Sequence, residues 1–162
     1  MKHIYWDDTE NSMCIGIIAE DAQILPAGAV VYSMPVKDKN SEYERFAKDY
    51  HIHFIFDDDI PTLGFYTVPL VSIFASDGQG GYIGSVGETV DLRGTAPICY
   101  IDSSRKCYLI AENSKKFLEI AEHWKENMIP YTEVEFFDSL EAAKEKHEFL
   151  DIAQIMQNPL NQ

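Results

Sequence analysis

The chain has 162 residues, of which 46% are hydrophobic and 12% aromatic, so it can fill one core and is not disordered as a whole. Its 27 acidic residues outnumber its 13 basic ones and give a formal net charge of -14. This charge argues against unaided binding to nucleic acid, because phosphates require a basic protein face. It suits a basic partner, although acidity that serves solubility alone explains it equally well.

The chain contains three cysteines, Cys14, Cys99 and Cys107, and no C-x-x-C pair. This pattern predicts neither a disulfide framework nor a zinc site, and we interpret the cysteines as core thiols in a reducing compartment. The first residues lack the apolar region of a signal peptide, and no apolar run reaches the roughly 18 residues of a membrane span. The sequence therefore predicts a cytoplasmic protein without a membrane segment.

Apolar runs rich in β-branched residues predict strands in the first third of the chain, at 13–19, 23–34 and 51–56. Pro26 and Gly28 interrupt the second run, which indicates a bulge or an edge position. A helix is expected over 41–50, where Ser41 and Glu44 have the spacing of a capping box.

Short apolar segments alternate with turn residues in the middle of the chain. They predict strands at 65–74, 81–86, 96–102 and 106–111. Consecutive short strands joined by short turns are typical of an antiparallel meander. A helix follows over 113–128, with Asn113 or Ser114 as its cap. Its apolar stripe consists of Phe117, Leu118, Ala121, Trp124 and Met128.

The chain ends in a further helical pattern. After an extended segment at 131–137, a C-terminal helix is predicted over 138–156, where Asp138 and Glu141 have capping-box spacing. The predicted fold class is therefore α+β, a single domain with an antiparallel β-meander sheet packed by helices, with C-terminal helices.

The segment FASDGQGGYIGS at 74–85 contains four glycines. A phosphate-binding loop requires a following helix, but the next residues are β-like and no G-K-[ST] is present. A calcium loop requires acids at alternating positions, and Asp77 is the one acid available. The segment therefore predicts a hairpin turn.

The pair His51-x-His53 is the best candidate for a metal site. On a strand, residues two apart share a face, so both imidazoles would meet one metal ion. With Asp57 and Gly64 the spacing resembles the first metal motif of cupins, but Arg45 replaces its leading glycine and the second motif is absent. We therefore expect no metal and no cofactor, and a small cupin-like metalloenzyme stays the alternative.

Three consecutive acids, Asp57, Asp58 and Asp59, form an anionic patch for a basic partner, a weak divalent site, or simply a solvated turn before Pro61. There is no G-x-S-x-G motif, and the cysteines lie in apolar strands, where thiols are inert. The sequence therefore predicts no catalytic set and no enzyme activity.

Residues 69–121 combine several of these features in one order: a strand, a glycine turn, a Pro-apolar-Tyr-Ile-Asp hairpin, and a strand that runs into a helix. The residues that carry this order are Phe74, Gly78, Gly80, Pro97, Tyr100, Ile101, Asp102, Ile110, Ala111, Ser114, Phe117 and Leu118. The segment resembles the SUKH superfamily, which comprises bacterial immunity proteins and fungal regulators of cell-wall synthesis. Tyr82 stands where that family often has Trp, and its N-terminal helix with an L-P motif is not evident.

The resemblance implies a single SUKH-like domain over 1–162 with a family-like core at about 61–128. It implies binding without catalysis, as in an immunity protein that neutralises a basic, nuclease-type toxin; a regulatory scaffold of cell-wall synthesis is the other role found in the family. The acids expected to bind the partner lie in turns that flank the meander. They are Asp57, Asp58, Asp59, Asp77, Glu88 and Asp91.

Overall fold

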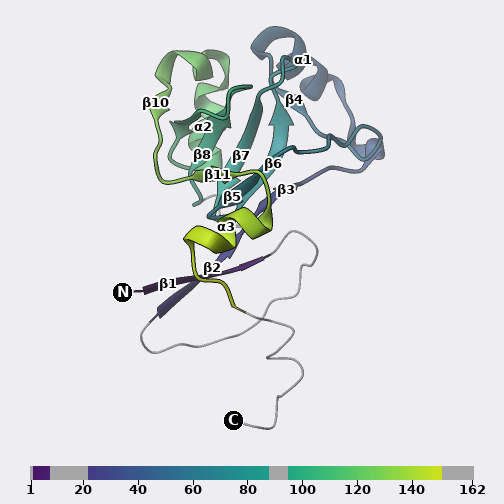
Figure 1. Cartoon of the computed structure of the whole chain (residues 1–162). Helices are drawn as coiled ribbons and strands as arrows, with labels where there is room; N and C mark the ends of the chain where they lie inside the picture. Colours follow the sequence, from purple (N-terminus) through teal and green to yellow (C-terminus); the bar gives the residue numbers. More distant parts are fainter. Residues whose placement is uncertain (1, 8–21, 88–94, 151–162) are drawn as a thin grey trace.

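The computed structural model describes residues 2–7, 22–87 and 95–150, and the strand predicted at 13–19, with Cys14, falls outside them. The strands are β1 (Lys2–Asp7), β2 (Ala22–Ala27), β3 (Ala29–Val31), β4 (His53–Phe54), β5 (Tyr66–Val68), β6 (Val71–Ser76), β7 (Tyr82–Val86), β8 (Ile98–Ile101), β9 (Cys107–Ala111), β10 (Ile129–Pro130) and β11 (Glu135–Phe137). The helical elements are α1 (Ser41–Tyr50), α2 (Ser114–Ile120), α3 (Leu140–Lys146) and the 3-10 elements η1 (Val36–Asp38) and η2 (Ala121–Asn127). Helices pack on a mostly antiparallel sheet (Figure 1), so the predicted α+β fold class is confirmed.

The central sheet is built on the predicted meander. Strands β6, β7, β8 and β9 follow one another as antiparallel neighbours, and β10 continues the sheet beyond β9. At the other edge β3 runs parallel to β6, and β4 pairs antiparallel with β6. Because successive side chains of a strand point to opposite faces, each strand contributes to both sides of this sheet.

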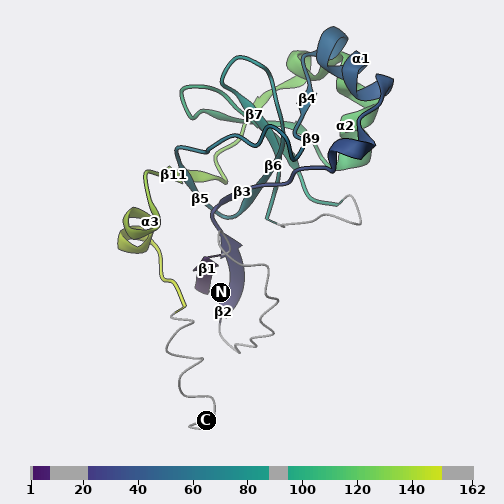
Figure 2. The same cartoon turned by 90° about the vertical axis from the view of Figure 1, so that its right-hand side faces the viewer.

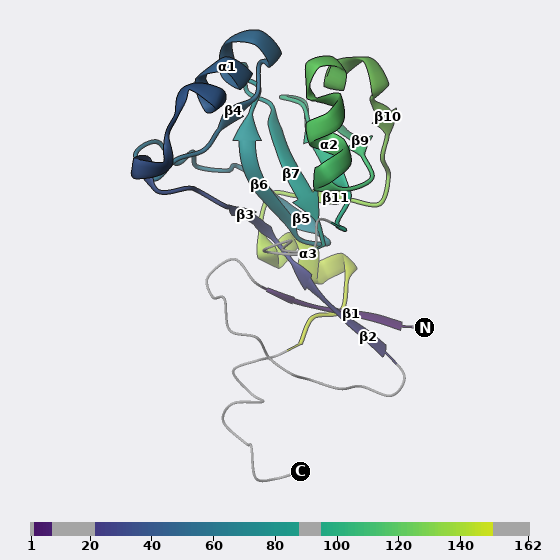
Figure 3. The same ribbon diagram turned by 180° about the vertical axis from the view of Figure 1, so that it is seen from behind.

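Elements α1, α2 and η2 cover one face of the sheet (Figure 3). Phe117 and Trp124 are 2% and 1% exposed and share a buried cluster with Ala75 and Ile83 of the sheet. Trp124 also donates a hydrogen bond of 2.8 Å from Nε1 to the backbone oxygen of Tyr50, which ties η2 to the end of α1. The predicted burial of Phe117 and Trp124 is therefore confirmed.

The predicted apolar stripe is wrong at one position, because Leu118 is 56% exposed. The helix predicted over 113–128 is not continuous, because α2 ends at Ile120 and the 3-10 element η2 follows it. Phe117 of α2 and Ala121 and Trp124 of η2 nevertheless share one buried cluster with the sheet. Leu118 follows Phe117 directly and is turned by about 100° from it, away from the sheet.

Extended chain covers the opposite face of the sheet. Val134 is buried there and Phe136 packs beside it, over a cluster that includes residues of β6, β7, β8 and β9. Arg105, in the turn between β8 and β9, holds this layer in place. Its Nη2 donates to the backbone oxygen of Gly64 at 2.6 Å, and its Nη1 pairs with Asp138 at 2.7 Å.

Strands β1 and β2, strand β5 and helix α3 form a third cluster at the end of the molecule opposite α1 and α2 (Figure 2). Strands β1 and β2 are parallel partners. The buried side chains of this cluster are those of Tyr5, Ala27, Tyr66, Val68 and Ala143. No helix within the described residues is long and apolar enough to cross a membrane.

The strand predicted at 65–74 is two strands in two different sheets. Strand β5 pairs with β11, whereas β6 belongs to the central sheet. Pro69 lies between them, and proline has no N–H group to donate to a strand ladder. The chain therefore leaves one sheet at this residue and enters the other.

The predicted C-terminal helix is shorter than expected and begins at a different cap. Helix α3 ends at Lys146, and the rest of the predicted range beyond residue 150 lies outside the described residues. The backbone N–H of Leu150 donates to the oxygen of Tyr5 at 2.8 Å, and the N–H of Tyr5 donates to the oxygen of Glu148 at 2.9 Å. Pairing with β1 therefore replaces the helical hydrogen bonds that the local pattern favours.

Polar side chains cap α1, α2 and α3. The caps are Asn40, Asn113 and Ser139, and each accepts a hydrogen bond from a backbone N–H of the first turn. Asn113 is one of the two predicted caps of α2. The caps predicted at Ser41 and Asp138 are each wrong by one residue, because the neighbouring residue has the extended backbone that a cap requires.

Cys99 and Cys107 are buried free thiols, as predicted. They lie on neighbouring strands but not opposite each other, since Cys99 faces Leu109 and Cys107 faces Ile101.

Candidate functional site

The glycine-rich segment reverses the chain between β6 and β7, as predicted. Asp77 organises this turn from within: its backbone N–H donates to Gly81, and its Oδ1 accepts from the N–H groups of Gln79 at 2.7 Å and Gly81 at 2.8 Å. Gly78 and Gly80 have φ angles of 79° and 93°, which are left-handed conformations that glycine adopts without strain. The loop is therefore a preformed structural turn.

The Asp77 carboxylate also connects this turn to β8. The Tyr100 hydroxyl donates to its Oδ2 at 2.6 Å, and Asp77 is 7% exposed. Burial by itself raises the pKa of Asp77, but the hydrogen bonds from Tyr100 and the turn amides outweigh it and hold the pKa below its ordinary value. Asp77 was expected to bind a partner, yet one of its carboxylate oxygens is bonded within the turn and the other to Tyr100 of β8.

The two histidines of the predicted metal motif do not lie on one strand. Strand β4 contains His53, whereas His51 is the C-cap of α1, with a left-handed φ of 59°. The premise that both imidazoles share a strand face is therefore wrong, because the end of α1 extends to His51. No group of three His, Cys, Asp or Glu residues within the described ranges can hold a metal ion.

The acidic turn, defined as residues 57–59, follows β4 on the surface. The Asp57 carboxylate accepts a hydrogen bond from the Ser33 hydroxyl, and Asp58 forms an ion pair of 2.7 Å with Lys39. The hydrogen bond from Lys39 lowers the pKa of the Asp58 carboxyl. The Asp59 carboxylate makes no hydrogen bond or ion pair with another described residue. Within the described residues, Asp58 is thus paired with a cation, Asp57 accepts from a neutral hydroxyl, and Asp59 has no polar partner for its carboxylate.

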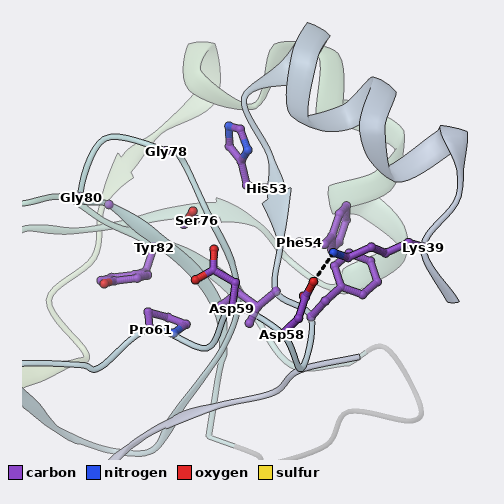
Figure 4. A pocket seen from close by; sticks show the side chains of 13 residues that line it. Lys39, His53, Phe54, Asp58, Asp59, Pro61, Ser76, Gly78, Gly80 and Tyr82 are labelled. Carbon is purple, nitrogen blue, oxygen red and sulfur yellow. Dashed lines mark hydrogen bonds and ion pairs between the residues drawn. The ribbon is translucent and has the colours of Figure 1, made fainter. Parts of the chain in front are cut away.

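A pocket of about 340 Å³ lies between the acidic turn and the glycine turn (Figure 4). The side chains around it include those of Lys39, His53, Phe54, Asp58, Asp59, Pro61, Ser76 and Tyr82. His53 and Tyr82 are both register partners of Ser76, on β4 and β7 respectively. Because directly opposite residues point to the same face, these three side chains form one row across the sheet.

Exposed apolar side chains occur directly after the acidic turn and in the segment that is joined to it. Tyr32, Val36 and Ile60 are 48%, 44% and 53% exposed. Backbone hydrogen bonds and the ion pair of Lys39 join the segment 32–39 to the acidic turn. Sequence reasoning did not identify these residues, because only the tertiary structure shows that their apolar side chains are left exposed.

The remaining two predicted contact residues, Glu88 and Asp91, lie outside the described residues. Of the other four, Asp57, Asp58 and Asp59 are together on the surface, and Asp77 is buried in the turn across the pocket.

Comparison of the chain with known protein families, with curated proteins and with solved structures finds no match. The resemblance to the SUKH superfamily therefore stays a prediction from the motif residues.

Proposed function

We propose that the protein is a non-catalytic binding module, a SUKH-like immunity protein that neutralises a basic, nuclease-type toxin domain. The observation that carries this proposal is the exposed acidic turn, together with the exposed apolar residues Ile60, which follows it, and Tyr32 and Val36 of the segment joined to it. Protein interfaces combine apolar side chains with charged surroundings, and exposed apolar residues on the segments that carry the acids suit such a surface.

The charge balance supports a basic partner. With a net charge of -14, the protein attracts a cationic surface from a distance. Complementary charge of this kind raises association rates by about 10 to 10³-fold. Nucleases expose cationic surfaces that bind phosphates, so an acidic protein that covers such a surface blocks the substrate as well.

The placement of the motif residues supports the same class of protein. Phe74 is in β6 before the glycine turn, Asp102 accepts hydrogen bonds from the turn between β8 and β9, and Phe117 seats α2 on the sheet. The buried thiols Cys99 and Cys107 suit the reducing cytoplasm, where an immunity protein meets its toxin.

The test recovers the partner by pull-down from the native host, where we expect a basic nuclease domain, and uses that domain as a purified probe in association kinetics. The variant carries Asp57→Lys, Asp58→Lys and Asp59→Lys, and the matched control carries Glu119→Lys, Glu122→Lys and Glu126→Lys in α2 and η2. Both triple variants change the net charge equally. We expect the first to associate at least about tenfold more slowly than the control at low salt, with little change in the unfolding midpoint of either.

Salt provides the second arm of the experiment. Because about 0.1 M salt screens exposed charges beyond about 10 Å, the wild-type association rate should fall steeply as salt is added. Equal slowing of both triple variants would place the interface elsewhere. An association rate that does not change with salt concentration would overturn the proposed function. A nuclease that stays fully active in the presence of excess immunity protein would overturn it as well.

A further inference from the structure

We infer that the pocket between the acidic turn and the glycine turn receives one basic side chain of the partner, with arginine preferred over lysine. This inference rests on the proposed function, because it names the group that the partner inserts. The pocket volume of about 340 Å³ is at the lower end of the range of about 300–1,000 Å³ for small-ligand sites. It suits one long side chain better than a cofactor.

The charged side chains around the pocket favour a cationic ligand. Lys39 at one end is neutralised by Asp58 at 2.7 Å, whereas the Asp59 carboxylate has no partner among the described residues. In Figure 4 the Asp59 side chain is turned toward Ser76 and Tyr82, away from the ion pair. A cation that enters the pocket therefore meets one unpaired carboxylate and no unpaired ammonium group from Lys39.

The aromatic wall favours a planar cation. Tyr82 lines the pocket and packs against Phe65, with 6.3 Å between the ring centroids. A guanidinium group stacks on an aromatic ring and forms parallel hydrogen bonds with a carboxylate, and a lysine ammonium does not combine the two. Arginine is therefore the residue that uses Tyr82 and Asp59 together.

The wall formed by the glycine turn is closely packed and hydrogen-bonded without any ligand. A Cβ atom on Gly78 would lie 2.9 Å from His53 Nε2, and one on Gly81 would lie 2.5 Å from the Tyr100 hydroxyl. Glycine at these positions lets the turn pack directly against the side chains of β4 and β8. A preformed wall costs little ordering entropy when the ligand binds, which strengthens the binding of a small group.

The experiment is an NMR titration of backbone amides in the full chain with N-acetyl-L-arginine amide. N-acetyl-L-citrulline amide, which has nearly the same shape without the charge, is the ligand control. We expect the amide signals of His53, Gly78 and Gly80 to shift and saturate in the millimolar range with the arginine probe. The citrulline probe should bind at least about tenfold more weakly, and N-acetyl-L-lysine amide should lie between them.

Two variants of the acidic turn locate the charge. Asp59→Asn should weaken binding of the arginine probe by about tenfold, whereas Asp57→Asn, outside the pocket lining, should change it less than about twofold. Both substitutions are isosteric and exposed, and the unfolding midpoints check that both variants are folded. Equal binding of the arginine and citrulline probes, or equal binding by wild type and Asp59→Asn, would overturn the inference.

The outcomes separate this inference from the proposed function. If the nuclease binds and the acidic-turn triple variant slows it while the arginine probe does not bind, the inference fails and the proposed function stands. If the arginine probe binds through Asp59 but no basic nuclease binds the protein, the inference about the pocket holds and the proposed immunity function fails.

Discussion

The hydroxyl of Tyr100 donates a hydrogen bond of 2.6 Å to Asp77, which joins β8 to the glycine turn between β6 and β7. The same carboxylate accepts from two amides of the turn. The buried Asp77 side chain thus orders the turn and attaches it to the sheet. The glycine turn lines the pocket, so the shape of that side of the pocket depends on these hydrogen bonds.

Substitution of Tyr100 and substitution of Asp77 should lower the stability of the protein by different amounts. Tyr100→Phe deletes one hydrogen bond and should lower the free energy of unfolding by about 1–2 kcal/mol. Asp77→Ala leaves two amides and the Tyr100 hydroxyl without their acceptor, and we expect a loss of about 2–4 kcal/mol. Urea unfolding measures both values. A cost of Asp77→Ala no greater than that of Tyr100→Phe would contradict this account of the turn.

The low pKa of Asp77 predicts how stability depends on pH. A carboxyl group whose pKa is lower in the folded state stabilises the protein above its unfolded pKa of about 3.9, and this contribution disappears as the pH falls through the folded value. Asp77→Asn lacks this contribution at every pH. The difference in unfolding free energy between wild type and Asp77→Asn should therefore shrink between pH 6 and pH 2, and a constant difference would show that Asp77 does not titrate abnormally.

Two glycines of the chain should respond differently to the same substitution. A Cβ atom at Gly81 would lie 2.5 Å from the Tyr100 hydroxyl and 2.6 Å from Asp77 Oδ2, whereas one at Gly64 would have nothing within 4 Å. Gly81→Ala should cost about 1–3 kcal/mol through overpacking, and Gly64→Ala less than about 0.5 kcal/mol. Thermal or urea unfolding of the pair checks this, and similar costs would mean that the turn relaxes freely.

The adjacent residues Phe117 and Leu118 provide a test of the helix orientation. Phe117 is buried and Leu118 is exposed. Phe117→Ala should lower the free energy of unfolding by about 3–5 kcal/mol, and Leu118→Ala by less than about 1 kcal/mol. The reverse order in urea unfolding would show that α2 presents its other side to the sheet.

The separation of His51 from the strand of His53 predicts that the purified protein carries no stoichiometric transition metal. Elemental analysis of the protein from its native host should find well below one zinc, iron or nickel ion per chain. A stoichiometric metal that disappears in His53→Ala would favour the metalloenzyme over the binding module.

Several features follow from the sequence because short-range interactions determine them. The Asp-Gly turn, the meander strands and the helix at 41–50 depend on residues a few positions apart, so composition and periodicity predict them. The burial of the two thiols follows from the apolar strands that contain them.

Other features were decided by contacts between distant parts of the chain. The segment after α3 pairs with Tyr5, so the helix is shorter than the local pattern predicts. The strand before Pro69 pairs with β11 instead of joining the central sheet, and Leu118 is exposed because it faces away from the sheet. The candidate site has the same origin. The sequence identified three adjacent acids, but only the tertiary structure pairs Asp58 with Lys39 and leaves the Asp59 carboxylate, which lines a pocket, without a partner among the described residues. Local patterns fix which conformations a segment prefers, whereas the hydrogen bonds and ion pairs that a side chain finally makes depend on which distant segments fold against it.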